Sequence, residues 1–408
     1  MDEISRYAVG LDVGTENVRA VVASVTRDGK LTIVGYNEAK NAGMRKGIVA
    51  NLTGPAEAID RVLGEVERMS GFEINSAVFS IGGAQILTTK VEGMIAAGMM
   101  DHEINEGDLD RVEQVAVTGR IPANMEILDV VPLGSAIDEQ GGIKDPVGMV
   151  GSRLDMKASV VTALGPNCEN LRRTAEMAKV VPERIVPGVV AAAKAVLSEK
   201  QMENGVAVVD FGAATTSVAI FEEGELQYVG VVPVGSNNVT NDLAIMLEIN
   251  TDIAEEIKRR YVSGAFLEMK DVVLKVGREE MTFERDKINE VVQARLEEIF
   301  DKVKKEIKKA GFERRLPEGI VLTGGGAKMR EIEIFAKRVL EASVKNGVSQ
   351  EIAGVADLAK KPEYATALGL MLIAAENNER GGNAKKKSKK VAKKEKKDGI
   401  LKRFFKKF

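Results

Sequence analysis

The chain has 408 residues, of which 44% are hydrophobic and 29% are charged, which is typical of a globular protein of two or three domains. A single cysteine, Cys168, and a single histidine, His102, exclude a disulfide framework and a Cys/His zinc site, and they argue against a Cys-His or Ser-His hydrolase. The net charge of −3 hides a split, because residues 384–408 carry 13 Lys or Arg against two acids. We therefore expect an anionic surface as the partner of this tail, and no nucleic acid on the acidic body.

The first predicted elements form a meander of three strands. Residues 7–22 contain two apolar strands on either side of Asp12-Val13-Gly14, and a third strand follows the Asp28-Gly29 turn at 31–35. A helix is predicted over 55–69, because apolar residues recur there on one face.

The same arrangement recurs 198 residues later. Residues 206–220 contain two apolar strands on either side of Asp210-Phe211-Gly212, and a third strand again follows a glycine turn. Helices are predicted over 238–247 and 252–261. Two similar units about 200 residues apart predict two lobes of like fold, and the alternation of strands and helices predicts an α/β architecture.

An aspartate and a glycine at the end of a strand suit a phosphate site. Glycine lets backbone N–H groups approach a phosphate closely, and a carboxylate can hold Mg²⁺ through water. One such motif alone more often serves only the turn, but two copies in the same context favour a polyphosphate held from both sides. The candidate residues are Asp12 and Asp210 for the metal, Gly14 and Gly212 for the close approach, and the hydroxyls of Thr15, Thr215 and Thr216.

A third candidate element is a glycine-rich turn. Residues 319–323 predict a buried strand, Gly324, Gly325 and Gly326 follow it, and a helix is predicted over 330–340. Such a turn lets the backbone lie flat against a nucleoside, although a simple tight turn is the alternative. Glu255 and Lys258, three residues apart on one helix face, could reach a ribose or base, or form a solvated ion pair.

Two phosphate hairpins followed by a glycine turn resemble the actin, Hsp70 and sugar-kinase ATPase superfamily. Within it, four motifs are similar to FtsA, the family of bacterial cell-division actins: residues 80–83, 142–149, 233–242 and 364–369. The resemblance implies an actin-like, ribonuclease H-like fold of two lobes with an inserted FtsA-type subdomain. It also implies ATP and Mg²⁺ as cofactors, and it adds Asn17, Gly235 and Asn238 to the cofactor-binding residues.

The resemblance implies the following domains. The first lobe comprises residues 1–84 and 162–197, and the inserted subdomain comprises 85–161. The second lobe comprises 198–248 and 315–375, with a partner-binding subdomain at 249–314. A flexible basic linker, 376–397, and a membrane-targeting helix, 398–408, follow.

The chain departs from the family pattern at four positions. Where the family has glycines in the second hairpin this chain has Ala213 and Ala214, it has Ser217 in place of an acid, and Asn17 replaces a common lysine. We therefore expect at most slow ATP hydrolysis, with no nominated catalytic base.

The last eleven residues predict a short amphipathic helix. At 100° per residue the apolar side chains occupy one face and the basic ones the other; the apolar set is Ile400, Leu401, Phe404, Phe405 and Phe408, and the basic set is Lys402, Arg403, Lys406 and Lys407. A helix of about 14 Å cannot span a bilayer, so we expect it to lie in the interface of an anionic membrane. A nucleic-acid tail and a helix that docks into a protein groove are the alternatives.

The helix predicted over 287–309 carries Arg295 and Glu298 opposite its apolar face. By resemblance these residues contact the C-terminal peptide of the division tubulin FtsZ; a solvated charged face is the alternative. The sequence is therefore interpreted as an ATP-binding scaffold that polymerises, tethers FtsZ to the cytoplasmic face of the membrane at the division site, and recruits later division proteins. A type IV pilus assembly protein of the same fold and a metabolic kinase are the rival interpretations.

Overall fold

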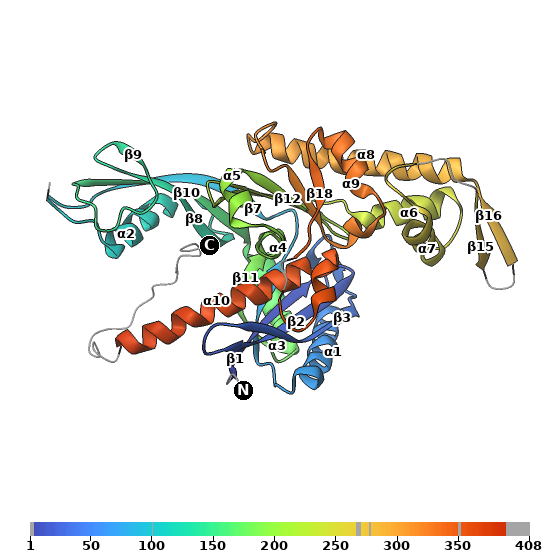
Figure 1. The fold of residues 1–408 in the computed structure, drawn as a ribbon, viewed down its shortest axis with the longest axis horizontal. Coiled ribbons are helices and arrows are strands. Elements are labelled where there is room, and N and C mark those ends of the chain that lie inside the picture. The colour runs from blue at the N-terminus through green and yellow to red at the C-terminus, as the bar shows by residue number, and fades with distance from the viewer. Residues whose placement is uncertain (1–3, 100, 267–270, 277–278, 350–351, 389–408) are drawn as a thin grey trace.

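The computed structural model describes residues 4–99, 101–266, 271–276, 279–349 and 352–388, and its centre is a pair of five-stranded sheets (Figure 1). The first sheet has the order β11-β6-β1-β2-β3 and the second the order β14-β13-β12-β17-β18. The first comprises β1 (Ile4–Val13), β2 (Asn17–Thr26), β3 (Leu31–Lys40), β6 (Ser76–Ile81) and β11 (Val181–Pro187). The second comprises β12 (Val206–Phe211), β13 (Thr216–Glu222), β14 (Glu225–Val232), β17 (Ile320–Thr323) and β18 (Val344–Asn346).

The two sheets are copies of one topology. In each, an antiparallel meander is extended by two parallel strands, β6 and β11 in the first and β17 and β18 in the second. The register repeats as well, because Asp12 pairs with Arg19 and Asp210 pairs with Ser217, 198 residues further on. The α/β fold with two like lobes is confirmed.

The helices of the first lobe cover both faces of its sheet. They are α1 (Thr53–Ser70), α3 (Gly165–Met177), α4 (Gly188–Val196) and α10 (Ala365–Ser388), and the small hairpin β4 (Met44–Arg45) with β5 (Ile48–Val49) lies beside them. The apolar face of α1 is buried, as its periodicity predicts, and α1 ends at Gly71 in the left-handed conformation, which glycine adopts without strain.

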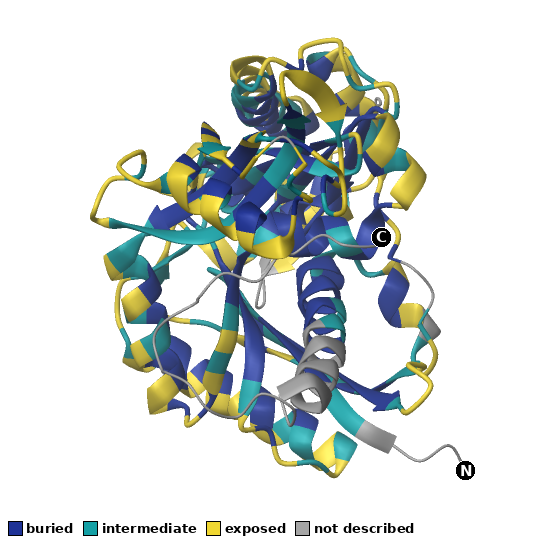
Figure 2. Ribbon diagram, turned by 90° about the vertical axis from the view of Figure 1, so that its left-hand side faces the viewer, coloured by how far each residue is buried: buried dark blue, intermediate teal, exposed yellow. Residues whose placement is uncertain are grey.

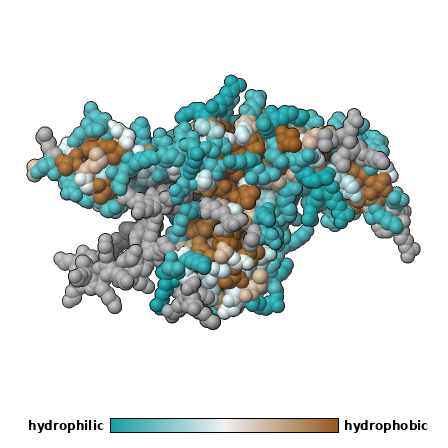
Figure 3. Space-filling view, in the orientation of Figure 1, coloured by the Kyte–Doolittle hydropathy of each residue, from teal (hydrophilic) through white to brown (hydrophobic). Residues whose placement is uncertain are grey.

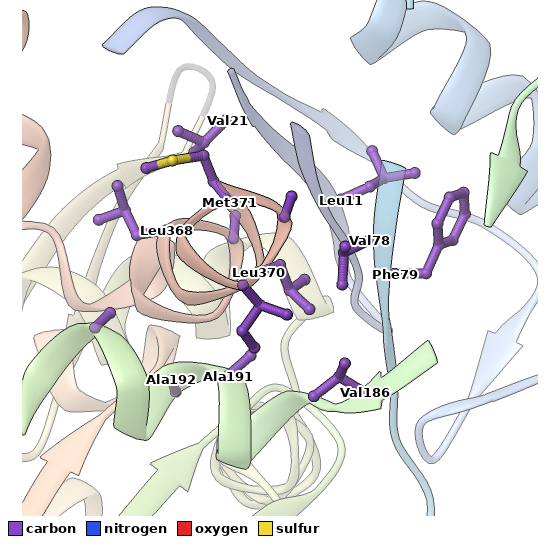
Figure 4. Close-up of a cluster of buried hydrophobic side chains, with 14 of the residues drawn as sticks. Leu11, Val21, Val78, Phe79, Val186, Ala191, Ala192, Leu368, Leu370 and Met371 are labelled. Carbon is purple, nitrogen blue, oxygen red and sulfur yellow. The ribbon is translucent and has the colours of Figure 1, made fainter. Parts of the chain in front are cut away.

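The position of α10 corrects two expectations. Leu368, Leu370 and Met371 pack among Leu11 and its neighbours in the first sheet (Figure 4), so residues 365–375 belong to the first lobe and not to the second. The helix also continues to Ser388, so the flexible linker expected from residue 376 is helical over its first part. Most residues from 365 to 375 of α10 are themselves buried (Figure 2). Residues 365–375 follow the second lobe in the sequence, but they pack against β1 and α4 of the first lobe.

The second lobe adds helices and a hairpin to its sheet, at the right of Figure 1. They are α5 (Glu199–Asn204), α6 (Ser236–Met246), α7 (Thr251–Tyr261), β15 (Val272–Val276), β16 (Glu279–Phe283), α8 (Arg285–Lys309), η1 (Gly325–Lys328), α9 (Ile332–Leu340), η2 (Ala356–Lys360) and η3 (Pro362–Tyr364). The rings of Phe211, Phe300 and Phe335 meet in its core. The apolar stripe of α8 is buried there, as predicted.

The inserted subdomain extends to the left in Figure 1 and has a core of its own. It comprises β7 (Leu87–Ala96), α2 (Glu106–Val117), β8 (Met125–Ile137), β9 (Gln140–Ile143) and β10 (Arg153–Leu164), with strand order β7-β10-β8-β9. Asn105 caps α2 with both bonds of a capping box.

The insert docks on β14 of the second lobe. Thr88 Oγ1 both donates to the carbonyl of Val229 (3.1 Å) and accepts from its N–H (2.8 Å), and Lys144 Nζ lies 3.1 Å from Glu203 Oε1. Hydrophilic side chains cover much of the face shown in Figure 3. Within the described residues, no helix combines the length and apolarity needed to cross a bilayer.

Candidate functional site

The two hairpin turns that carry the Asp-x-Gly motifs have the same geometry. The N–H of Gly14 donates to the carbonyl of Asn17 (3.1 Å), and the N–H of Gly212 donates to the carbonyl of Thr215 (3.0 Å). A Cβ atom at either glycine would lie within 2.9 Å of that same carbonyl oxygen, so only glycine fits without a shift. The structure therefore places two equivalent glycine turns, one on each lobe, at the ends of β1 and β12.

The carboxylates in front of these turns lie close enough to interact. Burial raises the pKa of Asp12, against the opposing charge of Arg19 and the hydrogen bond from Ser80. Burial raises the pKa of Asp210 to about 7, and the negative charge of Asp12 adds to this rise, while Arg19 and Thr366 oppose it. The predicted pair is thus brought together from segments 198 residues apart. Neighbouring carboxylates in a poorly solvated place favour a shared proton or a cation.

Ser80 holds the first carboxylate in place. Its Oγ donates to Asp12 Oδ1 (2.8 Å) and accepts from the N–H of Val13 (2.8 Å). Ser80 stands near the end of β6, the strand parallel to β1, so the family-like motif at residues 80–83 contributes a positioning hydroxyl.

Arg19 is a cation of this site that sequence reasoning missed. It is the cross-strand neighbour of Asp12, its Nε lies 2.9 Å from Glu38 Oε2, and its guanidinium lies 5.6 Å from the centre of the Tyr364 ring. Only 14% of its side chain is exposed. The antiparallel register after the Gly14 turn was the signal available, because it pairs residue 12 with residue 19.

The donor set suits Mg²⁺ more than other metals. Two carboxylates whose charges interact supply hard oxygen ligands, and Mg²⁺ usually takes one or two carboxylates together with water and phosphate oxygens. Within the described residues, no group of three or more His, Cys, Asp or Glu lies close enough together to hold a metal ion. Asp12 and Asp210 remain the residues that would hold it.

The three-glycine turn lies against the second hairpin. Gly324 has φ of 86°, and its N–H donates to the carbonyl of Pro362 (3.1 Å). A Cβ atom at Gly324 would overlap the carboxylate of Asp210, and one at Gly326 would lie 2.5 Å from the Phe211 ring. Gly325 is exposed, with open space where its Cβ would be. The predicted turn and hairpin are therefore adjacent, with Gly325 as the accessible member.

The start of α6 is bonded to the second hairpin. The N–H of Ser236 donates to the carbonyl of Gly212 (2.9 Å), and a Cβ atom at Gly235 would lie 2.5 Å from the carbonyl of Ala213. Asn238 accepts from the N–H of Gly235 through its Oδ1 (3.1 Å). Gly235 and Asn238 thus shape this turn beside the hairpin.

Lys258 is buried, not solvated, and it ties α7 to α6. Its Nζ lies 2.6 Å from Glu255 Oε2, and it donates to Thr240 Oγ1 (2.8 Å) and to the carbonyl of Ser236 (3.3 Å). Burial lowers the pKa of Lys258, and the charge of Glu255 opposes this. The ion pair therefore fixes the helix start next to the hairpin, and Glu255 is the more accessible of the two residues.

Thr216 corrects the expected set of hydroxyl donors. It is fully buried, and its Oγ1 donates to the carbonyl of Val234 (2.8 Å), so it does not face a ligand. The Oγ1 of Thr15 accepts from the N–H of Gly47 (3.1 Å), while Thr215 stays in the turn itself. Asn17 begins β2 directly after the first turn.

The candidate partner residues form a charged cluster on α8. Arg295 binds Asp242 of α6 with Nε at 2.5 Å and Nη2 at 3.1 Å, and it also pairs with Glu298, which pairs in turn with Lys302 at 2.5 Å. Both candidates are partly exposed. The proposed membrane residues 400–408 and the rest of the tail from residue 389 lie outside the described residues.

Comparison with known proteins agrees with this architecture. A family model described as "Cell division protein FtsA" matches residues 207–369, and one described as "SHS2 domain inserted in FTSA" matches residues 83–162. A Pseudomonas aeruginosa protein described as cell division protein FtsA is 36% identical over 374 residues, which cover 90% of this chain and 89% of that protein. The protein of the same description from Escherichia coli K12 is 31% identical over 384 residues, which cover 91% of each.

Solved structures show the same fold at low identity. The PilM-PilN type IV pilus biogenesis complex matches with a TM-score of 0.67 and 17% identity, over 90% of this chain and 98% of that chain. MreB5 of Spiroplasma citri bound to ADP matches with a TM-score of 0.56 and 13% identity, over 93% and 99%. The expected actin-like ATPase fold with an inserted FtsA-type subdomain is confirmed. At 31–36% identity over about nine-tenths of its length, the chain belongs to the FtsA family of cell division proteins.

Proposed function

We propose that the chain binds ATP with Mg²⁺ between its two glycine hairpins. The observation that carries this proposal is the pair of equivalent turns at Gly14 and Gly212, each preceded by a carboxylate that acts on the other. Backbone N–H groups at the turns would hold the phosphates, Asp12 and Asp210 would hold the ion, and the Gly325 turn would lie along the nucleoside. Bound Mg²⁺ would neutralise phosphate charge.

Nucleotide would serve as a clamp between the lobes more than as a substrate for rapid turnover. Ala213 and Ala214 place methyl groups in the second hairpin, and Ser217 offers no carboxylate next to it. For this reason the proposed ATPase activity is slow at most, and no residue is assigned as its catalytic base.

We further propose that the protein tethers FtsZ to the membrane. The terminal segment 398–408 would lie in the interface of the anionic cytoplasmic leaflet, as its amphipathic sequence predicts, with segment 389–397 as the basic connection. Arg295 and Glu298 would bind the C-terminal peptide of FtsZ, exchanging the bond with Asp242 for one with a carboxylate of the peptide. Head-to-tail association of copies would give a polymer at the division site that recruits later division proteins.

A type IV pilus role is the alternative function. The likeness to the PilM-PilN complex is one of fold at 17% identity, whereas relatives described as FtsA reach 36%. The pilus role would also leave the phenylalanine-rich tail without a purpose.

Thermal denaturation with and without MgATP or MgADP tests the nucleotide site. We expect a rise in melting temperature for the natural chain and a much smaller rise for Asp210→Asn, because the ion loses a ligand. Glu65→Gln, on the exposed face of α1, is the matched control. No stabilisation of the natural chain by either nucleotide would refute the proposal.

Sedimentation with vesicles containing phosphatidylglycerol tests the tether. The full chain should pellet with the vesicles, and a chain ending at residue 397 should stay in the supernatant. A fluorescent FtsZ C-terminal peptide should bind the natural chain and lose affinity for Arg295→Ala, while the exposed Arg314→Ala should bind normally. Equal binding to the two variants would exclude the assigned partner surface.

A further inference from the structure

The side chains of Asn237 and Glu16 form a hydrogen bond between the two lobes at the hairpins. Asn237 Nδ2, in the first turn of α6, donates to Glu16 Oε2 at 3.0 Å, and Glu16 lies in the turn between β1 and β2. The two residues are 221 positions apart in the chain. The bond therefore spans the place where the proposed nucleotide would be held.

Both partners are fixed to their own hairpin. Asn41 donates its N–H to the carbonyl of Glu16 (2.9 Å) and its Nδ2 to the carbonyl of Gly14 (2.7 Å). On the other lobe the N–H of Asn237 donates to the carbonyl of Ala213 (2.8 Å). Because the backbone of each residue is bonded to its own hairpin, the bond between the two side chains fixes the spacing of the two turns.

A lysine from each lobe also interacts with the carboxylate of Glu16. Lys40 Nζ of the first lobe lies 3.7 Å from Glu16 Oε1, and Lys258 of the second lobe is among the cations that interact with the Glu16 charge. The Glu16 carboxylate therefore interacts with one lysine of each lobe, and 46% of its side chain is exposed. A polyphosphate that passes this point meets the like charge of Glu16 and competes with it for the exposed Lys40.

We propose that Glu16 and Asn237 form a latch that gates nucleotide exchange. The inference rests on the proposed nucleotide binding. The latch opens to let a nucleoside triphosphate or diphosphate pass and closes again afterwards, so it slows both binding and release. A latch that closes again after each exchange changes the barrier more than the affinity.

Stopped-flow fluorescence with mant-ATP and mant-ADP measures both rates. The variants are Glu16→Ala, Asn237→Ala and the double variant, and Glu65→Ala on α1 is the control for loss of an exposed, ion-paired glutamate. We expect association and dissociation rate constants to rise together by about three- to tenfold in each single variant, which is the effect of one partly exposed charged hydrogen bond. Kd should change less than about twofold. The double variant should match the single ones, because they remove one shared interaction.

Asn237→Asp is a second, nearly isosteric test. It replaces the amide donor with a carboxylate that faces Glu16, so exchange should be at least as fast as in Asn237→Ala. Circular dichroism melting identifies any variant that fails to fold, and the Asp variant then carries the test. If the natural chain binds mant-ATP and all latch variants exchange it at the natural rates, the latch is refuted while the nucleotide site stands. If the natural chain binds no nucleotide, the proposed function fails and the latch with it.

Discussion

Gly324 turns directly over the carboxylate of Asp210. With φ of 86°, it adopts a backbone conformation that other residues take only with strain, and a Cβ atom there would overlap Asp210 Oδ1 and lie 2.7 Å from the carbonyl of Phe211. The close approach joins the three-glycine turn to the second hairpin.

Gly324→Ala should therefore destabilise the fold by at least about 2 kcal/mol and abolish any nucleotide-dependent stabilisation. Gly325→Ala is the matched control, because its Cβ would meet open space and its φ is not positive. Urea denaturation compares the two variants. Equal stability of the two would contradict the assigned packing.

The partly buried carboxyl of Glu225 should make the free energy of unfolding depend on pH. Its pKa is raised from 4.5 to about 7, chiefly by burial; Lys144 opposes the rise, and the charges of Asp129 and Glu203 contribute to it. The folded state thus holds the proton more tightly than the unfolded state, so the free energy of unfolding falls as pH rises from about 4.5 to about 7.

Glu225→Gln imitates the protonated form and should remove this loss. We expect it to stabilise the protein by about 1–2 kcal/mol at pH 8, after allowance for the partial exposure of the side chain, and by nothing near pH 4.5. Melting temperatures at the two pH values measure this. The exposed Glu223→Gln should show no such difference.

The side chain of Thr88 should contribute to the attachment of the inserted subdomain to β14 of the second lobe. Its hydroxyl makes both hydrogen bonds to the backbone of Val229, so Thr88→Val keeps the shape and leaves two backbone groups unpaired. We expect a loss of about 1–2 kcal/mol and faster proteolysis at the insert junctions near residues 85 and 162. Thr89→Val, which is exposed on the same strand, should behave like the natural chain.

Gly369 and Gly64 predict opposite effects of the same substitution in two helices. A Cβ atom at Gly369 of α10 would overlap the carbonyl of Ala191 in α4, so Gly369→Ala should separate these helices and cost several kcal/mol. At Gly64 of α1 a Cβ atom would meet nothing within 4 Å. Gly64→Ala should stabilise the protein by about 0.5–1 kcal/mol, because alanine favours helix. Chemical denaturation distinguishes the signs.

The repeated meander could be predicted from sequence because its signals are local: alternating strands, glycine turns and a repeated Asp-x-Gly. The place of α10 could not, because it depends on a close approach between Gly10 and the backbone of Met371, more than 350 residues apart. The same holds for Glu16 and Asn237, which share no pattern.

The direction in which a side chain points was a second feature that could not be predicted from the sequence. Thr215 and Thr216 stand next to one another, and successive residues entering a strand point to opposite faces, so only one of them can face a ligand. Both threonines were expected to offer a hydroxyl to the ligand, but the hydrogen bond from Thr216 to the carbonyl of Val234 shows that Thr216 points into the core. Arg19 was missed for a related reason, since its importance comes from the register opposite Asp12.

The helix α10 is about 36 Å long, and it packs against β1, the strand that carries Asp12 near its end. A pulling force on the C-terminal end of α10 would therefore be transmitted along the helix to β1, the strand that carries the carboxylate of Asp12.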